Sequence, residues 1–196
     1  MAKIYTIPNI ITFVRIILIP IILYLLFSDN SKVVLVAGLL FIVSSISDYF
    51  DGYLARTLNQ SSKLGTLLDP IADKLLIAAV IIVLIDTRVI ADINVIPAII
   101  ILLREIAISG LREFLAKGSV KLPVSSLAKV KTFLQMFCIS VLLTGETGNK
   151  IINFQDYNAQ TIGIILLWLS AFLTLYTGYE YLRKGIDHAI SEDNKD

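Results

Sequence analysis

The chain has 196 residues, of which 56% are hydrophobic and 17% are charged, and its mean hydropathy is +0.80. Because this charged fraction lies below the roughly 25% typical of soluble domains, we expect an all-α polytopic membrane protein that folds as one domain over residues 1–196. The formal net charge of +1 excludes a global basic field that would attract nucleic acid, and the single cysteine, Cys138, excludes an intrachain disulfide.

A helix that crosses the hydrocarbon core of a bilayer needs about 20 mostly apolar residues. Segments of this kind follow one another along the chain, with polar turns or loops between them. We predict helices over Pro8–Phe27, Lys32–Thr57, Leu64–Asp86, Ile93–Lys117, Val124–Leu143 and Thr161–Leu182. Met1–Ile7 is expected at the membrane interface, and Thr144–Gln160 is expected to be the longest loop. The predicted fold therefore has six transmembrane helices and a short N-terminal interfacial segment.

The Lys and Arg residues near the predicted helix ends set the orientation, because cytoplasmic loops of membrane proteins are enriched in basic residues. One side carries Lys3, Arg56, Lys63, Lys117, Lys121, Arg183 and Lys184, and the other carries Lys32, Arg88 and Lys150. Both termini are therefore expected in the cytoplasm. Neither a cleavable signal peptide nor an Arg- and Ser-rich transit segment is evident, which favours a bacterial plasma membrane.

The most informative segment is residues 48–73, where four aspartates interrupt two apolar helices. They stand in the pattern Asp48-x2-Asp51-Gly52-x2-Ala55-Arg56-x8-Gly65-x3-Asp69-x3-Asp73. A carboxylate at the centre of a membrane helix costs roughly 2.5 to 3.5 kcal/mol on insertion scales. Intramembrane acids usually mark functional sites. Four of them need compensation, and bound cations would supply it.

Helical geometry brings these acids together, because a helix turns about 100° per residue. Asp48 and Asp51 share one stripe, and Asp69 and Asp73 share a stripe on the next helix. Both stripes lie about 12 to 14 Å from the cytoplasmic helix ends, so the site should open to the cytoplasm. Ligands that are all oxygen favour Mg²⁺ or Mn²⁺ over Zn²⁺. We therefore predict that the four carboxylates bind divalent cations. We expect two ions, although the four acids could also share one.

Small residues at Gly52, Ala55 and Gly65 remove side-chain bulk from the same stripes, so a substrate could approach the backbone there. Small residues are also common at plain helix contacts.

A carrier that used the acids as a cation relay is a different interpretation of the four aspartates. Such a carrier would distribute charges across the membrane, whereas these acids gather at one leaflet and no inverted repeat is visible.

The aspartate pattern resembles the signature of the CDP-alcohol phosphotransferase family, and every signature position is matched. The resemblance extends to one branch, the bacterial phosphatidylglycerophosphate synthases, and it covers nearly the whole chain. The motifs that carry it are Pro8-Asn9-x2-Thr12-x2-Arg15, Leu68-Asp69-Pro70-x-Ala72-Asp73-Lys74, Arg104-Glu105-x6-Arg112-Glu113-Phe114 and Lys129-x-Lys131-Thr132-x2-Gln135.

This resemblance implies a reaction in which a hydroxyl attacks the lipid-bearing phosphorus of CDP-diacylglycerol and CMP leaves. In the branch that the chain resembles, the alcohol is sn-glycerol 3-phosphate. The family also implies a homodimer among membrane lipids and dependence on a divalent cation. The same chemistry with inositol phosphate or serine as acceptor stays open, because the aspartate motif handles only the shared donor.

The resemblance also implies roles for single residues. Asp73 would be the general base as well as a metal ligand. The residues expected to bind the CDP-lipid are Gly52, Ala55, Arg56 and Gly65. Arg56 could instead be an interfacial anchor.

An acceptor that carries a phosphate needs a cationic pocket, because guanidinium and ammonium groups both bind phosphate well. The residues expected to form it are Arg112, Lys129, Arg104 and Lys131. Arg104 is as well explained by a pair with Glu105 or with an acid of another helix, and Lys131 could snorkel to the headgroups instead. Arg15 could help to hold phosphate or simply brace the bundle.

Overall fold

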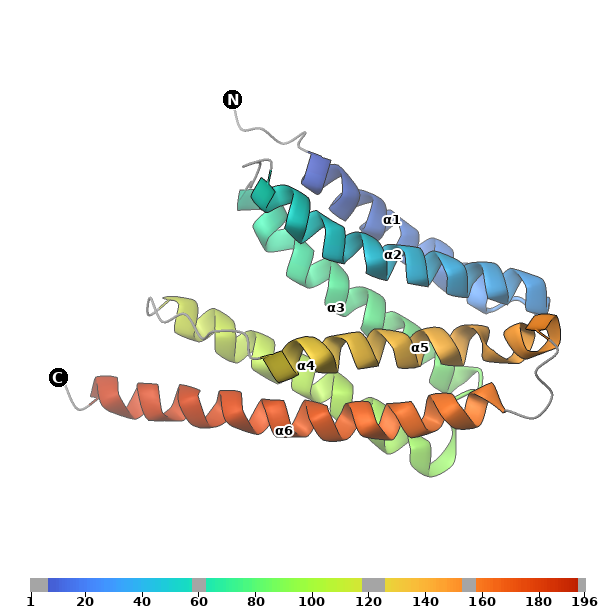
Figure 1. Ribbon diagram of the computed structural model, residues 1–196. Helices are drawn as coiled ribbons and strands as arrows, with labels where there is room; N and C mark the ends of the chain where they lie inside the picture. The colour runs from blue at the N-terminus through green and yellow to red at the C-terminus, as the bar shows by residue number, and fades with distance from the viewer. Residues whose placement is uncertain (1–6, 58–62, 118–125, 153–157, 194–196) are drawn as a thin grey trace. The chain divides into compact units, whose positions relative to one another are not determined.

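The computed structural model of the chain describes residues 7–57, 63–117, 126–152 and 158–193. Within these ranges every regular element is helical (Figure 1). The α-helices are α1 (Ile7–Leu26), α2 (Ser31–Thr57), α3 (Lys63–Asp86), α4 (Val95–Lys117), α5 (Ser126–Ile152) and α6 (Ala159–Asp193), and the 3-10 helix η1 (Asp92–Asn94) precedes α4. The all-α class is therefore confirmed. Hydropathy also placed the ends of α1 to α4 within two residues of their observed positions.

The last two helices are longer than the sequence predicts. The loop predicted over Thr144–Gln160 was wrong, because α5 continues to Ile152 and α6 begins at Ala159. Hydropathy marks where a helix leaves the hydrocarbon, whereas its backbone hydrogen bonds can continue into the polar region. The interfacial segment predicted over Met1–Ile7 lies outside the described residues, except that Ile7 begins α1.

The helices are apolar enough for a membrane. Within the described ranges, four segments have the length and composition to cross one, namely Asn9–Leu26, Asp92–Leu115, Ser126–Gly145 and Ala159–Arg183. Ser31–Ser47 forms a shorter apolar helix. Large apolar side chains such as Phe133 and Phe172 are exposed, as expected for surfaces that contact lipid rather than water. The chain is a multi-pass membrane protein.

The structure divides into two compact units, each of which is described by itself. Unit 1 comprises Met1–Ile90 and Ile139–Gly163, and unit 2 comprises Ala91–Cys138 and Ile164–Asp196. In unit 1, α1 packs against both α2 and α3 (Figure 1). The predicted aspartate site belongs to unit 1, and the predicted acceptor-phosphate residues belong to unit 2.

One face of α1 is buried, and its residues recur at a spacing of three and four, as an amphipathic stripe does. The buried residues are Asn9, Thr12 and Arg15 in the first half of the helix and Ile19, Ile22 and Leu26 in the second half. The stripe is therefore polar at one end of the bundle and apolar at the other. The polar half contacts the aspartates of α3.

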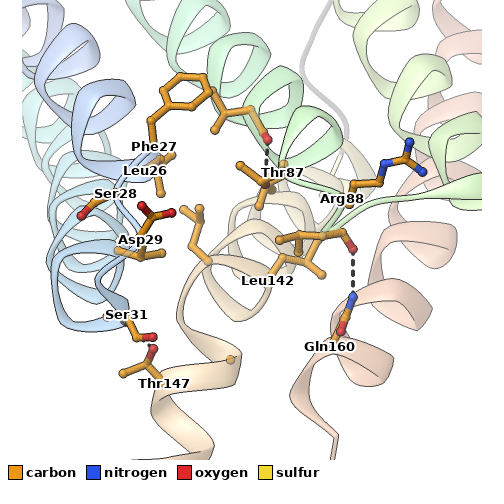
Figure 2. A pocket seen from close by; sticks show the side chains of 16 residues that line it. Leu26, Phe27, Ser28, Asp29, Ser31, Thr87, Arg88, Leu142, Thr147 and Gln160 are labelled. Atoms are coloured by element: carbon orange, nitrogen blue, oxygen red, sulfur yellow. Dashed lines mark hydrogen bonds between the residues drawn. The ribbon is translucent and has the colours of Figure 1, made fainter.

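The other end of unit 1 contains a cavity of about 520 Å³ (Figure 2). The cavity is lined by residues at the end of α1, the start of α2 and the end of α3, and by residues of α5 and α6. Gln160 Nε2 donates to the Val89 carbonyl at 3.2 Å beside it. Asp73 and Val83 of α3 are separated by about 15 Å of helix. None of the described lining residues belongs to the predicted site, so we assign no substrate to this cavity.

The close approach of α2 and α5 in unit 1 depends on Gly38. A Cβ atom there would lie 2.7 Å from Thr144 Cγ2 and 3.3 Å from Leu143 Cβ. Thr144 cannot rotate away without losing the hydrogen bond from its Oγ1 to the Ser140 carbonyl at 2.7 Å. We expect Gly38→Val to destabilise the protein by about 1 to 3 kcal/mol, measured as a lower midpoint of thermal unfolding in detergent.

The matched control is Gly110→Val in α4. A Cβ atom at Gly110 meets no heavy atom of the described residues within 4 Å. This variant should therefore unfold close to the wild-type midpoint. Equal losses for both variants would contradict the packing account.

Candidate active site

Two polar residues of α1 contact two of the aspartates of α3, Asp69 and Asp73. Thr12 Oγ1 donates a hydrogen bond to Asp69 Oδ1, and Arg15 Nη1 forms an ion pair with Asp73 Oδ1 at 2.7 Å. The Arg15 side chain is 2% exposed and that of Asp73 is 29% exposed. Thr12 and Arg15 are three positions apart on α1, and Asp69 and Asp73 are four apart on α3. Residues at this spacing lie on one helical face, so the two contacts lie next to each other between α1 and α3. The acids are fixed from the buried side and remain partly accessible from the other.

These contacts compensate the presence of acids within an apolar helix. The Arg15 guanidinium supplies an opposite charge to Asp73, and the Thr12 hydroxyl supplies a donor to Asp69. The Asp73 side chain is 29% exposed and Asp69 is partly exposed, so a cation could reach both carboxylates.

The other half of the predicted metal site lies on α2. The helix continues through the backbone of Asp48 and Asp51, but their side chains lie outside the part of the chain that the structure describes. The side chains of Ala55 and Arg56 and the surroundings of Gly52 lie outside it as well. Gly65 is described, and it is buried on α3 one turn before Asp69.

The described donors suit a hard divalent cation. No group of three or more His, Cys, Asp or Glu side chains comes together among the residues that the structure describes, and two of the four predicted ligands lie outside them. What is described is a pair of partly exposed carboxylates with a neighbouring hydroxyl. Oxygen donors of this kind are the ligands that Mg²⁺ prefers.

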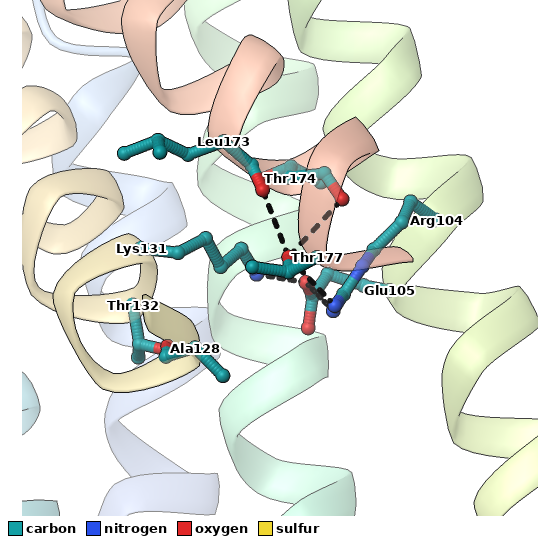
Figure 3. A network of polar contacts seen from close by, with 8 residues as sticks. All are labelled: Arg104, Glu105, Ala128, Lys131, Thr132, Leu173, Thr174 and Thr177. Carbon is teal, nitrogen blue, oxygen red and sulfur yellow. Dashed lines mark hydrogen bonds and ion pairs between the residues drawn. The ribbon is translucent and has the colours of Figure 1, made fainter. Parts of the chain in front are cut away.

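In unit 2, two of the predicted acceptor-phosphate residues form a largely buried network with an acid (Figure 3). Lys131 Nζ bonds to Glu105 Oε1, and Arg104 Nη1 lies 3.2 Å from the same oxygen. Arg104 Nη2 also donates to Thr177 Oγ1 at 3.0 Å. The Arg104 guanidinium carbon lies 5.8 Å from the centroid of the Tyr181 ring. The alternative that Arg104 pairs with Glu105 is therefore confirmed.

Lys131 is 3% exposed, so the alternative that it snorkels to the headgroups was wrong. Arg112 and Lys129, the other two predicted acceptor residues, are exposed on α4 and α5. Positions two apart on a helix do not face each other, and accordingly Lys129 and Lys131 differ in burial. Arg104 and Arg112 are eight residues apart on α4, so they share a helical face.

Sequence reasoning did not identify two of the contacts that hold these sites. Thr12 belongs to the motif Pro8-Asn9-x2-Thr12-x2-Arg15, but the motif does not indicate that Thr12 is the partner of Asp69. A signal was available, since Asn9, Thr12 and Arg15 continue the spacing of Ile19 and Ile22. Glu105 was considered a partner of Arg104 alone. Its contact with Lys131 joins α4 to α5 and leaves no periodicity in the sequence.

Comparison with known proteins agrees with these features. The chain matches the family CDP-alcohol phosphatidyltransferase over residues 5–176. It is 48% identical to the CDP-diacylglycerol–glycerol-3-phosphate 3-phosphatidyltransferase of Rickettsia felis, over 90% of this chain and 93% of the relative. Proteins of the same name from Bacillus subtilis and Cereibacter sphaeroides are 34% and 32% identical, over 92% and 96% of this chain and 95% and 99% of theirs. The chain therefore belongs to the CDP-alcohol phosphatidyltransferase family.

The contact between Thr12 and Asp69 gives a testable prediction. Thr12→Val keeps the branched shape and removes the hydroxyl donor, so Asp69 loses a bond that orients it. We expect a loss of stability of about 1.5 to 3 kcal/mol, the range for hydrogen bonds to charged groups. We also expect a weaker affinity for Mn²⁺, measured by titration calorimetry of the protein in detergent.

Thr87→Val, in the turn directly after α3, is the matched control, because Thr87 Oγ1 donates at 2.8 Å to the Val83 carbonyl of α3. Its Mn²⁺ affinity should equal that of the wild type. A Thr12→Val protein with wild-type affinity would show that the hydroxyl does not position a metal ligand.

Proposed function

We propose that the chain transfers the phosphatidyl group of CDP-diacylglycerol to sn-glycerol 3-phosphate, giving phosphatidylglycerophosphate and CMP, in the synthesis of phosphatidylglycerol and cardiolipin. The family membership and the shared name of relatives at up to 48% identity support this reaction. The structural observation that carries it is the pair of α3 aspartates that α1 holds in place, partly accessible, inside an apolar bundle.

In this reaction the acceptor oxygen bonds to the phosphorus that carries diacylglycerol, and the bond from that phosphorus to the bridging oxygen breaks. CMP leaves with the bridging oxygen, and the hydroxyl proton passes to a base. We assign the base to Asp73, whose carboxylate is partly exposed and is oriented by Arg15. A bound divalent cation would neutralise the diphosphate and stabilise the departing CMP oxygen.

We assign the cation ligands to Asp48, Asp51, Asp69 and Asp73, which would hold two Mg²⁺ or Mn²⁺ ions. Support for the α2 pair comes from its register. Ala37, Phe41 and Ser44 are buried on α2 at a spacing of four and three, and Asp48 and Asp51 continue that spacing in the sequence. Because α1 packs against both helices, a stripe on α2 and a stripe on α3 can serve one site.

The same stripes contain the residues that we assign to the CDP-lipid, namely Gly52, Ala55, Arg56 and Gly65. Gly65 is buried one turn before Asp69, so it lies on the same face of α3 as that carboxylate. Arg56 would contact the phosphates of the nucleotide.

We assign the acceptor phosphate to Arg112, Lys129, Arg104 and Lys131. The two exposed cations would attract the phosphate, and Arg104 and Lys131, which are largely buried, would bind it where charge interactions are stronger. A cationic pocket favours glycerol phosphate over serine. Inositol phosphate shares the phosphate, and it remains the rival acceptor within the same chemistry.

We also propose that α2 and α3 complete a set of six membrane helices in a single domain. The enzyme would be a homodimer in a bacterial plasma membrane, with both termini and the active site on the cytoplasmic side. The excess of basic residues near one set of helix ends supports the orientation. The bacterial sources of the relatives support the compartment.

The function is tested by release of CMP from CDP-diacylglycerol by the purified protein in detergent with Mg²⁺. Glycerol 3-phosphate, inositol phosphate and serine would be supplied as separate acceptors. We expect CMP with glycerol 3-phosphate alone, and none after addition of a chelator. Release with another acceptor would contradict the acceptor assignment, and no release with any acceptor would contradict the chemistry.

The base assignment is tested by Asp73→Asn. An amide keeps the shape and can still accept a hydrogen bond from Arg15, but it cannot take the proton of the attacking hydroxyl. We expect turnover to fall by about a hundredfold or more, with folding and CDP-lipid binding retained. Asp86→Asn, an exposed acid at the end of the same helix, should turn over at the wild-type rate. Near-normal turnover by Asp73→Asn would refute the assignment.

A further inference from the structure

The buried network of unit 2 carries more positive than negative charge. Arg104 and Lys131 both contact a single carboxylate oxygen, Glu105 Oε1. Their side chains are 12% and 3% exposed, and that of Glu105 is 21% exposed. Among the described contacts of the network, two cations therefore share one anion within candidate membrane spans. Excess charge in such a place is costly, and a further anion would relieve it.

Two buried polar side chains on the neighbouring helices point to the same conclusion. The Gln135 amide lies one turn after Lys131 on α5, and Thr174 Oγ1 lies one turn before Thr177 on α6. Both side chains are almost fully buried, and neither finds a hydrogen-bond partner among the described residues. Buried polar atoms are normally satisfied, so these helices offer donors and acceptors to a polar ligand in addition to the charges.

We propose that Glu105 is the resident counter-anion of the acceptor-phosphate site, and that the phosphate of the acceptor displaces its carboxylate from Arg104 and Lys131. This inference rests on the proposed function and names the residue that sets the affinity for the acceptor. A carboxylate offers one negative charge through the single oxygen that both cations share. A phosphomonoester offers up to two negative charges on three terminal oxygens, so it matches two cations better.

The contacts of the network indicate that Glu105, and not Arg104, is the residue that a phosphate can displace. Arg104 is held independently by α6, through Thr177 Oγ1 and the Tyr181 ring. The backbone of α6 also fits closely against Arg104, because a Cβ atom at Gly178 would lie 3.1 Å from Arg104 Cγ. The guanidinium can therefore stay in place when Glu105 moves. Glu105 is also the most exposed of the three charged residues.

The test is Glu105→Gln in the full-length enzyme in detergent. The substitution keeps the shape and removes the competing charge. We expect the KM for sn-glycerol 3-phosphate to fall roughly three- to tenfold, equivalent to about 0.7 to 1.4 kcal/mol, while the KM for CDP-diacylglycerol is unchanged. We also expect inorganic phosphate to raise the midpoint of thermal unfolding more in this variant than in the wild type.

Glu180→Gln on α6 makes the same chemical change in the same unit and serves as the control. It should leave both KM values and the response to phosphate unaltered. An acceptor KM that stays constant or rises in Glu105→Gln would overturn the proposal, because a carboxylate that only braces the helices does not compete with phosphate. Equal changes in both KM values would overturn it as well.

Lys131→Met tests a second consequence of the proposal, that the phosphate binds this cation, and it applies even if Glu105→Gln does not fold. Removing this cation should abolish the stabilisation by phosphate, and stabilisation equal to that of the wild type would overturn the proposal. These experiments distinguish a failure of the proposed function from a failure of the proposed role of Glu105. If the wild type releases no CMP with glycerol 3-phosphate but phosphate stabilises the variants as expected, the proposed function fails and the role of Glu105 stands. If the wild type is active and Glu105→Gln has an unchanged acceptor KM, only the role of Glu105 fails.

Discussion

A carboxylate within an apolar helix needs a partner, and at Asp73 the partner is Arg15. Placing an aspartate at the centre of a membrane helix costs roughly 2.5 to 3.5 kcal/mol. Removing one member of a buried ion pair costs about 3 to 5 kcal/mol, somewhat less where one member is partly exposed, as Asp73 is. The ion pair with Arg15 therefore offsets the cost of placing Asp73 in an apolar helix. This contact joins the polar half of the buried stripe of α1 to α3.

The charged networks of the two units have net charges of opposite sign. In unit 1, Asp69, Asp73 and the guanidinium of Arg15 sum to one excess negative charge. In unit 2, Arg104, Lys131 and Glu105 sum to one excess positive charge. The first network is complementary to a cation and the second to an anion. An enzyme that joins a metal-bound diphosphate to a phosphorylated alcohol requires both kinds of site.

Much of this could be predicted from the sequence, because it depends on local periodicity. The ends of α1 to α4 follow from the length of the apolar segments, and the stripe that contains Asp69 and Asp73 follows from the helical repeat. The continuation of α5 to Ile152 could not be predicted in this way. Hydropathy reports the hydrocarbon boundary and does not report where the hydrogen bonds of a helix end.

Contacts between helices were the harder part. The sequence suggests that Arg104 and Lys131 are both ligands for phosphate. Nothing in their spacing shows that Glu105 on α4 contacts both of them. That contact arises when α4 and α5 pack together and place Glu105 against Lys131. Thr12 presents the same difficulty, since its partner Asp69 is 57 positions away along the chain. Both residues act through others, and the sequence motifs gave them no role of their own.

The central claim is that the carboxylates of α2 and α3 bind divalent cations, and the most direct measurement is the stoichiometry of Mn²⁺ binding by electron paramagnetic resonance. The purified wild type would be compared in detergent with Asp69→Asn, and Asp86→Asn would serve as the control. The account predicts two Mn²⁺ ions per chain in the wild type and in Asp86→Asn, displaced by Mg²⁺, and fewer bound ions in Asp69→Asn. Equal binding by the wild type and Asp69→Asn, or no specific binding by the wild type, would contradict it.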